Sequence, residues 1–202
     1  MALAPEKTAA LIEADSPEAK VELAGFSTGD YSVGRPFWVR ALWFLVNARV
    51  LQNPANPSSA LKKIVLRAFG AKIGKGVYLK PGINVKNPWL LEIGDDCWIG
   101  EGVWFDNLEP ITIGSNVCIS QAAYLCTGNH DWTDPTMSYL LGAVRVEEGA
   151  WICTRAMVMS GVSVGRNAIV GAGAVLSRDA EAGWIYMGNP AQQLKKRKLR
   201  KP

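Results

Sequence analysis

The chain has 202 residues, of which 49% are hydrophobic and 20% charged, a composition typical of a globular protein and not of a disordered one. The net charge of +4 comes from the C-terminus, because six basic residues and no acidic one follow residue 194, leaving 16 basic against 18 acidic residues before it. Nucleic-acid binding would depend on this tail alone, without a recognised binding motif, and we do not expect it. No metal site is expected either, since one histidine and four separated cysteines form no ligand pattern.

Residues 1–72 are predicted to form an N-terminal lead and a helical region. The longest apolar stretch, Phe37 to Leu51, predicts a helix with Trp38, Leu42, Phe44 and Leu45 largely on one side. It contains two arginines and an asparagine, and it is shorter than the ~20 apolar residues that a membrane-spanning helix needs. We therefore expect a helix that docks on the protein or lies on a surface.

A second helix is predicted after the two prolines at 54 and 57, which end the first one. Ser58 or Ser59 offers an N-cap, and Gly70 is a natural residue just past the helix end. The residues expected on its apolar face are Leu61, Ile64, Val65, Ala68 and Phe69, with Lys62, Lys63 and Arg67 on the opposite face.

From residue 73 to residue 176 an apolar residue recurs every six positions, in fifteen units that form five groups of three. The recurring residues are Ile73, Leu79, Val85, Ile93, Ile99, Phe105, Ile113, Ile119, Leu125, Val146, Ile152, Val158, Val164, Val170 and Leu176. A small or medium residue usually stands four positions after each of them. Such a period is too short for a helical pair and fits one short strand plus a turn, so that three units make one triangular coil of a solenoid.

The pattern therefore predicts an all-β solenoid of about five coils over residues 73–180, followed by a C-terminal turn and a basic tail over residues 181–202. The recurring residues should stack inside as one core. The glycines that follow several of them should allow tight corners with positive φ.

The repeat is interrupted once at length. The third and fourth groups start 33 residues apart where the first groups are 20 apart, which predicts a loop insertion near residues 130–145. The loop contains His130, the only histidine in the chain. Long excursions from a compact repeat are often functional, and a neutral imidazole is a general base near pH 7. From the residues alone, a catalytic histidine and an ordinary surface histidine remain about equally supported.

Four segments carry a resemblance to a known family: Trp98-Ile99-Gly100-Glu101, Phe105-Asp106-Asn107-Leu108, Cys118-Ile119-Ser120-Gln121 and Thr127-Gly128-Asn129-His130-Asp131. With the repeat, they resemble the hexapeptide-repeat acyltransferases, and in particular the colanic acid biosynthesis acetyltransferases, over residues 26–194. The resemblance implies a left-handed parallel β-helix, whereas the general rule for parallel crossovers would give a right-handed one.

What the resemblance implies about function is acetyl transfer from acetyl-CoA to a sugar hydroxyl of a surface glycan such as an exopolysaccharide. It also implies direct attack in a ternary complex, a homotrimer with its cleft between neighbouring subunits, and a cytoplasmic location. The thiols are read as reduced, in agreement with that location.

Site residues follow from the same resemblance. His130 matches the catalytic histidine of related galactoside and maltose acetyltransferases, which implies the role of general base. The residues expected to bind the acceptor are Asp106, Asn107, Asn129, Asp131 and Trp132. Those expected to bind coenzyme A are Trp151 and Thr154 at the thioester, Ala172 along the pantetheine arm, Ser177 and Arg178 at the adenosine end, and Lys195 at the 3′-phosphate.

Two alternatives remain open at this point: a non-catalytic scaffold built from hexapeptide repeats, and a serine-type O-acetyltransferase. A zinc carbonic anhydrase is excluded because it needs three histidines, and a nucleotidyltransferase because the first 72 residues hold no Gly-rich nucleotide motif. The helix with Trp38, Trp43 and Phe44 either makes a peripheral contact with the inner face of a membrane or covers the open end of the solenoid. The second role is favoured, because an uncovered end exposes unpaired strand edges.

Overall fold

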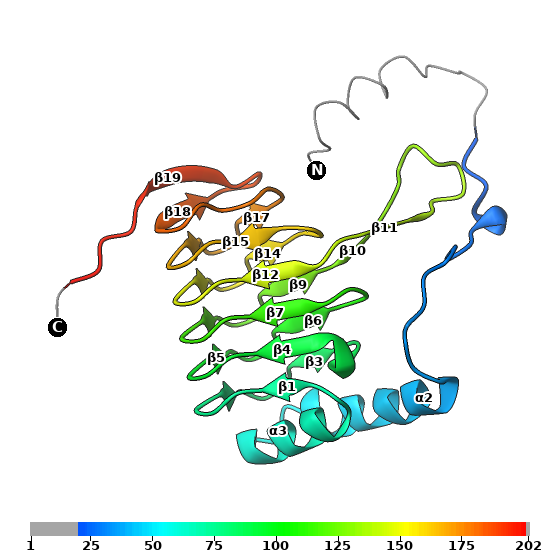
Figure 1. The fold of residues 1–202 in the computed structure, drawn as a ribbon, viewed down its shortest axis with the longest axis horizontal. Helices are drawn as coiled ribbons and strands as arrows, with labels where there is room; N and C mark the ends of the chain where they lie inside the picture. Colours follow the sequence, from blue (N-terminus) through cyan, green and yellow to red (C-terminus); the bar gives the residue numbers. More distant parts are fainter. Residues whose placement is uncertain (1–19, 201–202) are drawn as a thin grey trace.

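Three stacks of short parallel strands form the body of the protein, in a computed structural model that describes residues 20–200 (Figure 1). Sheet A contains β1 (Lys72–Ile73), β4 (Leu91–Ile93), β7 (Ile111–Ile113), β12 (Val144–Val146) and β15 (Ser163–Val164). Sheet B contains β2 (Tyr78–Leu79), β5 (Trp98–Ile99), β8 (Cys118–Ile119), β13 (Trp151–Ile152), β16 (Ile169–Val170) and β18 (Trp184–Met187), with β19 (Gln192–Lys196) antiparallel at its end. Sheet C contains β3 (Asn84–Val85), β6 (Trp104–Asp106), β9 (Tyr124–Cys126), β14 (Met157–Val158) and β17 (Val175–Leu176).

The chain visits sheets A, B and C in turn, so each circuit makes one triangular coil of a left-handed parallel β-helix. Within each sheet a strand pairs with the strand one coil away, as Trp98 does with Cys118 on sheet B. Five coils are complete. A bridge from Val164 to Ala180 and the strand β18 add an incomplete sixth turn, where the sequence predicted about five coils and a plain turn.

The core of the solenoid confirms the six-residue period. All fifteen recurring residues are buried, from Ile73 with 8% of its surface exposed to Leu125 with none. The small or medium residues four positions later are buried as well, so each coil has two inward positions per side. Each fully buried aliphatic side chain contributes ~1.5–3 kcal/mol, and the stacked coils form one continuous hydrophobic core.

The glycines after the recurring residues have a different role from the one predicted. Gly94 and Gly100 do not have positive φ. A Cβ at Gly100 would lie 2.7 Å from the backbone N of Gln121 in the next coil, so the missing side chain allows close stacking. Positive φ occurs instead two residues later, where Asp96 and Gly102 turn the corner. Glycine is therefore required at these positions because the backbones of neighbouring coils are too close to admit a side chain.

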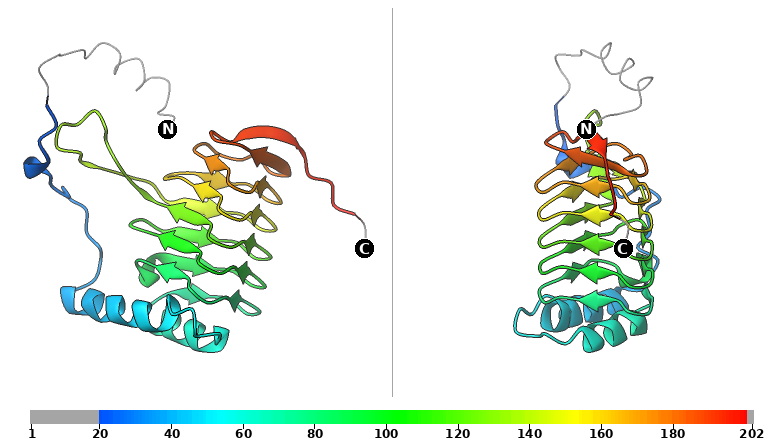
Figure 2. Two further views of the ribbon diagram at one scale, coloured as in Figure 1. Left: turned by 180° about the vertical axis from the view of Figure 1, so that it is seen from behind. Right: turned by 90° about the vertical axis from the view of Figure 1, so that its left-hand side faces the viewer.

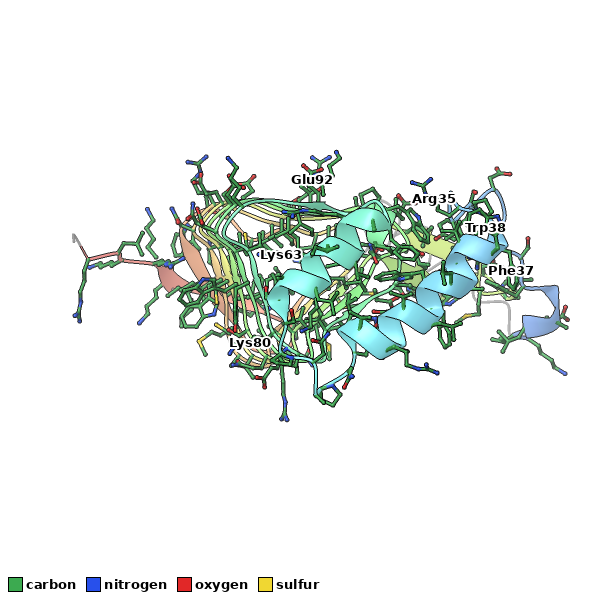
Figure 3. The ribbon with its side chains drawn as sticks, turned by 90° about the horizontal axis from the view of Figure 1, so that it is seen from below. Arg35, Phe37, Trp38, Lys63, Lys80 and Glu92 are labelled. Carbon is green, nitrogen blue, oxygen red and sulfur yellow. The ribbon has the colours of Figure 1, made fainter. Side chains whose placement is uncertain are left out.

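The first helical segment lies across the lower end of the solenoid and consists of α2 (Phe37–Val46) and a turn of π-helix, η2 (Asn47–Leu51) (Figure 3). Trp43 is buried against the solenoid, and its indole Nε1 donates to the carbonyl oxygen of Val85 at 2.9 Å. The first coil therefore buries Trp43, Asn47 and Leu51, whereas the residues predicted largely on one side of the helix are exposed: Trp38, Leu42, Phe44 and Leu45.

The second helix, α3 (Ser59–Ala68), also lies under the solenoid, and Ser58 is its N-cap, accepting a hydrogen bond from the Leu61 backbone N–H at 3.2 Å. Its predicted apolar face is partly correct: Val65 and Phe69 pack against the core, but Ile64 is 63% exposed, and Lys62 and Leu66 are the buried residues. The Lys62 ammonium is satisfied inside by the carbonyl oxygen of Asn56 at 2.6 Å, and burial lowers its pKa.

Two short 3₁₀ turns complete the helical elements, η1 (Leu23–Gly25) and η3 (Pro88–Leu90). Residues 20–36, called here the N-terminal strap, run from the outer end of α2 along the side of the solenoid (Figure 2). Within residues 20–200, none of the helices has both the length and the apolar character needed to cross a bilayer.

Candidate functional site

The interruption of the repeat is a β-hairpin that leaves the solenoid after β9, at the corner where the chain turns from sheet C toward sheet A. Its strands are β10 (Gly128–His130) and β11 (Tyr139–Leu141), antiparallel, with His130 opposite Tyr139. The hairpin projects sideways from the coils and is seen from both sides in Figures 1 and 2. It starts two residues before the predicted loop and returns to the solenoid at β12, so the excursion has regular structure of its own.

His130 is held by a backbone carbonyl within this hairpin. Its ring nitrogen Nδ1 forms a short hydrogen bond with the carbonyl oxygen of Met137. A carbonyl oxygen only accepts, so Nδ1 must carry the proton, and in the neutral ring the other nitrogen, Nε2, then has a free lone pair. The contact selects the tautomer that a general base requires.

Met137 reaches this position through a strained backbone. Its φ of 56° lies in the left-handed region, which costs a residue other than glycine on the order of 1–3 kcal/mol. The other such residues among those described, Asp96, Asn116, Ala122, Arg155 and Asn167, occupy corners of the coils. Met137 alone among them lies in the hairpin, where its conformation presents its carbonyl to the histidine ring.

Aromatic rings surround the imidazole. The rings of Phe26 and Tyr139 lie 5.8 Å and 5.3 Å from the His130 ring, centroid to centroid. Tyr31 packs edge-on against Tyr139 at 5.5 Å and donates through its hydroxyl to the carbonyl oxygen of Leu108 at 3.2 Å. Phe26 and Tyr31 belong to the strap, whose Glu22 backbone N–H also donates to Pro135 in the hairpin at 2.8 Å. The strap therefore covers one side of the histidine.

Carboxylates fix the tip of the hairpin. Asp131 accepts from the Thr133 backbone N–H at 2.9 Å, and Asp134 accepts from the Thr136 backbone N–H at 2.8 Å. Hydrogen bonds from Ser138 and Thr136 lower the pKa of Asp134 to about 2. The Asp134 cap is therefore formed in the ionised state at neutral pH, and the tip that it fixes carries Trp132, which is 58% exposed.

Asp106 lies one coil below the hairpin, opposite Cys126 of β9. Its two oxygens accept from Lys86 Nζ at 2.8 Å and from the Tyr124 hydroxyl at 2.7 Å. Burial, with hydrogen bonds to Cys126 and Asp106, raises the pKa of the Tyr124 phenol. The carboxylate keeps 16% of its side chain exposed and sits at the base of the hairpin, where the sequence placed it.

Asn107 does not reach the site. Its side chain has no exposed surface, and it exchanges hydrogen bonds with the backbone N–H and carbonyl of Asn87 at 2.9 and 2.7 Å. This amide ladder holds two neighbouring coils together. Asn129 lies next to the histidine, and its side-chain oxygen accepts from the His130 backbone N–H at 2.9 Å.

The residues predicted to bind coenzyme A divide into three groups. Trp151 and Lys195 line a groove of about 670 Å³ on sheet B, together with Ile169 and Ile185. Thr154 and Ala172 lie in adjacent turns between sheets B and C, where the Thr154 carbonyl oxygen accepts from the Gly173 backbone N–H at 2.9 Å. Ser177 and Arg178 follow β17 at the turn that leaves sheet C.

Two of the three groups lie away from His130 in one protomer, whereas Ser177 and Arg178 follow β17 at the same corner of the solenoid from which the hairpin leaves. The hairpin leaves at the end of sheet C, whereas Thr154 and Ala172 lie at its beginning, so the width of the sheet separates them. Trp151 lies on β13 of sheet B, where its indole Nε1 donates to Ser120 Oγ at 2.9 Å.

Sequence reasoning missed the aromatic partners of the histidine. Phe26 and Tyr31 precede His130 by about 100 residues, and no local pattern links them to it. Tyr139 was placed in the loop, but its pairing opposite His130 depends on the hairpin register.

Comparison with known proteins agrees with this architecture. Residues 143–178 match the family model "Bacterial transferase hexapeptide (six repeats)". The chain is 34% identical over 176 residues to the acetyltransferase WcaF of Escherichia coli, whose assignment to colanic acid biosynthesis is provisional, covering 87% of this chain and 97% of that protein.

Two solved structures share the fold. A hexapeptide-repeat acetyltransferase from Vibrio cholerae, solved with acetyl-CoA, has a TM-score of 0.73 at 21% identity, covering 80% of this chain and 88% of that one. A maltose O-acetyltransferase from Clostridium difficile has a TM-score of 0.68 at 21% identity, covering 80% and 86%.

Proposed function

The chain belongs to the hexapeptide-repeat acetyltransferases, and on that premise we propose that it transfers an acetyl group from acetyl-CoA to a sugar hydroxyl during the synthesis of a surface polysaccharide. The relative WcaF supports the polysaccharide as the acceptor class, and the acetyl-CoA complex of the Vibrio cholerae neighbour supports the donor. The single observation that carries the mechanism is the bond between His130 Nδ1 and the Met137 carbonyl oxygen.

His130 is the general base in this proposal. Its Nε2 lone pair takes the proton as the sugar oxygen attacks the thioester carbonyl, and the resulting imidazolium returns the proton to the departing thiolate of coenzyme A. The carbonyl oxygen of Met137 accepts the hydrogen bond from Nδ1–H throughout the reaction and prevents the imidazole ring from rotating. A positioned base of this kind contributes ~10²–10⁴-fold in rate.

The acceptor is assigned to the face of the hairpin and the coil below it. Asp106 and Asp131 offer carboxylate oxygens to sugar hydroxyls, Asn129 offers its amide, and Trp132 offers an exposed ring at the hairpin tip. Asn107, although predicted, is left out of this set because its amide is buried and fully used between two coils.

The donor is assigned to the remaining predicted residues. Ala172 is exposed and small, so a thin pantetheine arm can pass along the turn between sheets B and C beside Thr154. Trp151 contributes a ring that is 40% exposed, and Lys195 a cation in the same groove. Ser177 and Arg178 are assigned to the phosphates of the adenosine end, where a guanidinium binds best.

The outward faces of the three sheets support a trimer. Outward positions on sheet A are charged or polar: Lys72, Glu92, Thr112, Arg145 and Ser163. Those on sheet B are apolar (Tyr78, Trp98, Cys118, Trp151, Ile169 and Ile185), and those on sheet C are largely so (Asn84, Trp104, Tyr124, Met157 and Val175). Two different apolar faces on one chain suit a head-to-tail interface that closes into a ring. A ring would also bring the hairpin of one copy toward the two donor groups of the next that one protomer keeps apart from its own hairpin.

The lower helices support a peripheral contact with the cytoplasmic face of a membrane. Phe37, Trp38 and Phe44 on α2 are 79%, 68% and 71% exposed, and Arg40 and Arg49 lie on the same segment. An apolar helix surface with flanking cations is typical of interfacial binding. The cysteines of the described region are all free thiols, in keeping with a reducing compartment.

Replacing His130 by Ala should lower kcat by ~10²–10⁴-fold because the base is lost, without changing the affinity for coenzyme A. The measurement is thiol release from acetyl-CoA with a panel of sugar acceptors, paired with calorimetric titration of coenzyme A. Lys72→Gln on sheet A is the matched control and should behave as wild type. A His130→Ala enzyme with the wild-type rate would remove the histidine from the mechanism.

Light scattering should give a mass three times the 21.9 kDa of the chain. Trp98→Glu, which introduces charge on the apolar face of sheet B, should produce a monomer with little acetyltransferase activity, whereas Thr112→Glu on sheet A should remain trimeric. Full activity of the monomeric variant would show that one protomer holds the complete site.

Sedimentation with vesicles that contain ~30% anionic lipid should carry the wild-type protein into the pellet, less so at high salt. Trp38→Ser should weaken this binding several-fold, and Leu199→Ser, at an equally exposed residue near the other end of the chain, should not. Equal sedimentation of both variants would exclude α2 as the contact surface.

A further inference from the structure

A groove of about 850 Å³ lies between α2, the N-terminal strap, the corner of the solenoid at residues 84–89 and the hairpin. Tyr139 and Leu108 line it at the end next to His130, and Asn47 and Gln52 line it at the end next to the helices. Since Tyr139 contacts the His130 ring, the groove leads from the catalytic histidine down the outer side of the molecule. His130 and the residues predicted to bind the acceptor or coenzyme A are not among its lining residues.

The groove is positively charged. Arg35, Arg40 and Lys86 line it, and no acidic residue does. Arg40 also lies close enough to lower the pKa of the Tyr31 phenol in part, although burial of Tyr31 dominates and raises that pKa. Arg35 lies at the outer end of α2, 6.0 Å above the Trp89 ring, and Figure 3 shows it beside Phe37 and Trp38. Arg35 and Arg40, with no carboxylate among the lining residues, are suited to a phosphate-bearing ligand, and Lys86 adds an ammonium that is paired with Asp106.

A buried amide at the lower end of the groove is incompletely satisfied. Asn47 is 5% exposed, and its Nδ2 donates to Asn84 Oδ1 at 2.7 Å, but its own Oδ1 has no hydrogen-bond partner. An unpaired buried oxygen costs ~1–3 kcal/mol, so it marks a place where a ligand donor improves the structure. Asn47 opens the π-helical turn η2, and such turns are frequent at functional sites.

The remaining lining is aromatic and partly exposed. Trp104 is 42% and Phe44 71% exposed, and Trp89 is fixed by donation of its Nε1 to the Val33 carbonyl oxygen at 2.8 Å. Rings of this kind present flat apolar surface to the C–H faces of sugar rings, while the amides of Asn84 and Gln52 face hydroxyl groups. Cations, amides and aromatic rings together match a saccharide that carries a phosphate.

We propose that this groove is the acceptor subsite for a saccharide esterified to phosphate or diphosphate, with Arg35, Arg40 and Lys86 on the phosphate oxygens and Asn47 Oδ1 accepting from a sugar hydroxyl. The identification of the bound saccharide as an acceptor rests on the acetyl transfer proposed above. The phosphate places the saccharide along the groove, and its far end reaches His130. The carrier beyond the phosphate is a nucleoside or a polyprenol, since both present the same diphosphate.

The test is calorimetric titration of the full chain, with the donor site saturated by coenzyme A, using inorganic pyrophosphate, UDP-glucose and farnesyl diphosphate as probes. Wild type should bind pyrophosphate saturably. Arg40→Gln should weaken that binding about tenfold, as expected for loss of a charge-assisted hydrogen bond. Arg49→Gln, nine residues after Arg40 in η2 and outside the groove, should stay within twofold.

If UDP-glucose binds more tightly than pyrophosphate, the carrier is a nucleotide. If farnesyl diphosphate binds more tightly than pyrophosphate, the carrier is a polyprenol. Either result supports the groove as the acceptor subsite. Absence of saturable binding by all three probes, or equal weakening by Arg40→Gln and Arg49→Gln, overturns it. Because binding is measured without turnover, a failed groove leaves the His130 experiment unaffected, and a failed His130 experiment leaves pyrophosphate binding intact.

Discussion

The hydrogen-bond ladder between coils is the constraint on which the structure depends. Each strand donates to and accepts from the strand one coil away, as the Gly94 N–H does to the Ile113 carbonyl oxygen at 2.8 Å. Since every side of the triangle must stay in register, coils have nearly equal lengths, and extra residues fit only where the chain turns a corner. The hairpin is the one large insertion among the coils, and it begins directly after Cys126, the last residue of its strand. The solenoid is thereby a rigid support that fixes where the histidine leaves it.

The hairpin in turn depends on backbone groups to hold the His130 ring in place. The carbonyl oxygen of Met137 accepts from His130 Nδ1, and strained backbone at Met137 orients that carbonyl. The strap adds Phe26 from outside, so the ring is supported by its own hairpin and by a distant segment. A carbonyl oxygen only accepts hydrogen bonds, so this contact favours the neutral ring that carries its proton on Nδ1.

The sequence predicted the solenoid well because its signal is local and repeated. A six-residue period fixes which side chain points inward, and Phe105 or Val158 needs no long-range information to be assigned to the core. The buried residues of α2 and α3 were predicted only in part, because the end of the solenoid, a tertiary surface, determines that Trp43 and Lys62 are buried. Local sequence patterns also do not reveal how closely neighbouring coils approach each other, as they do at Gly100. In the site, His130 was found as a lone histidine in a broken period, whereas Asn107 was placed by motif, and only the fold reveals that its amide joins two coils.

The central claim is that a backbone carbonyl holds His130 as the Nδ1-protonated tautomer and leaves Nε2 as the base. Because the chain contains one histidine, a long-range ¹H–¹⁵N NMR spectrum of uniformly labelled protein reports on this residue without assignment by mutation. At a pH where the ring is neutral, the claim predicts a protonated-type ¹⁵N shift for Nδ1 and an unprotonated-type shift for Nε2. A spectrum in which Nε2 carries the proton would contradict it.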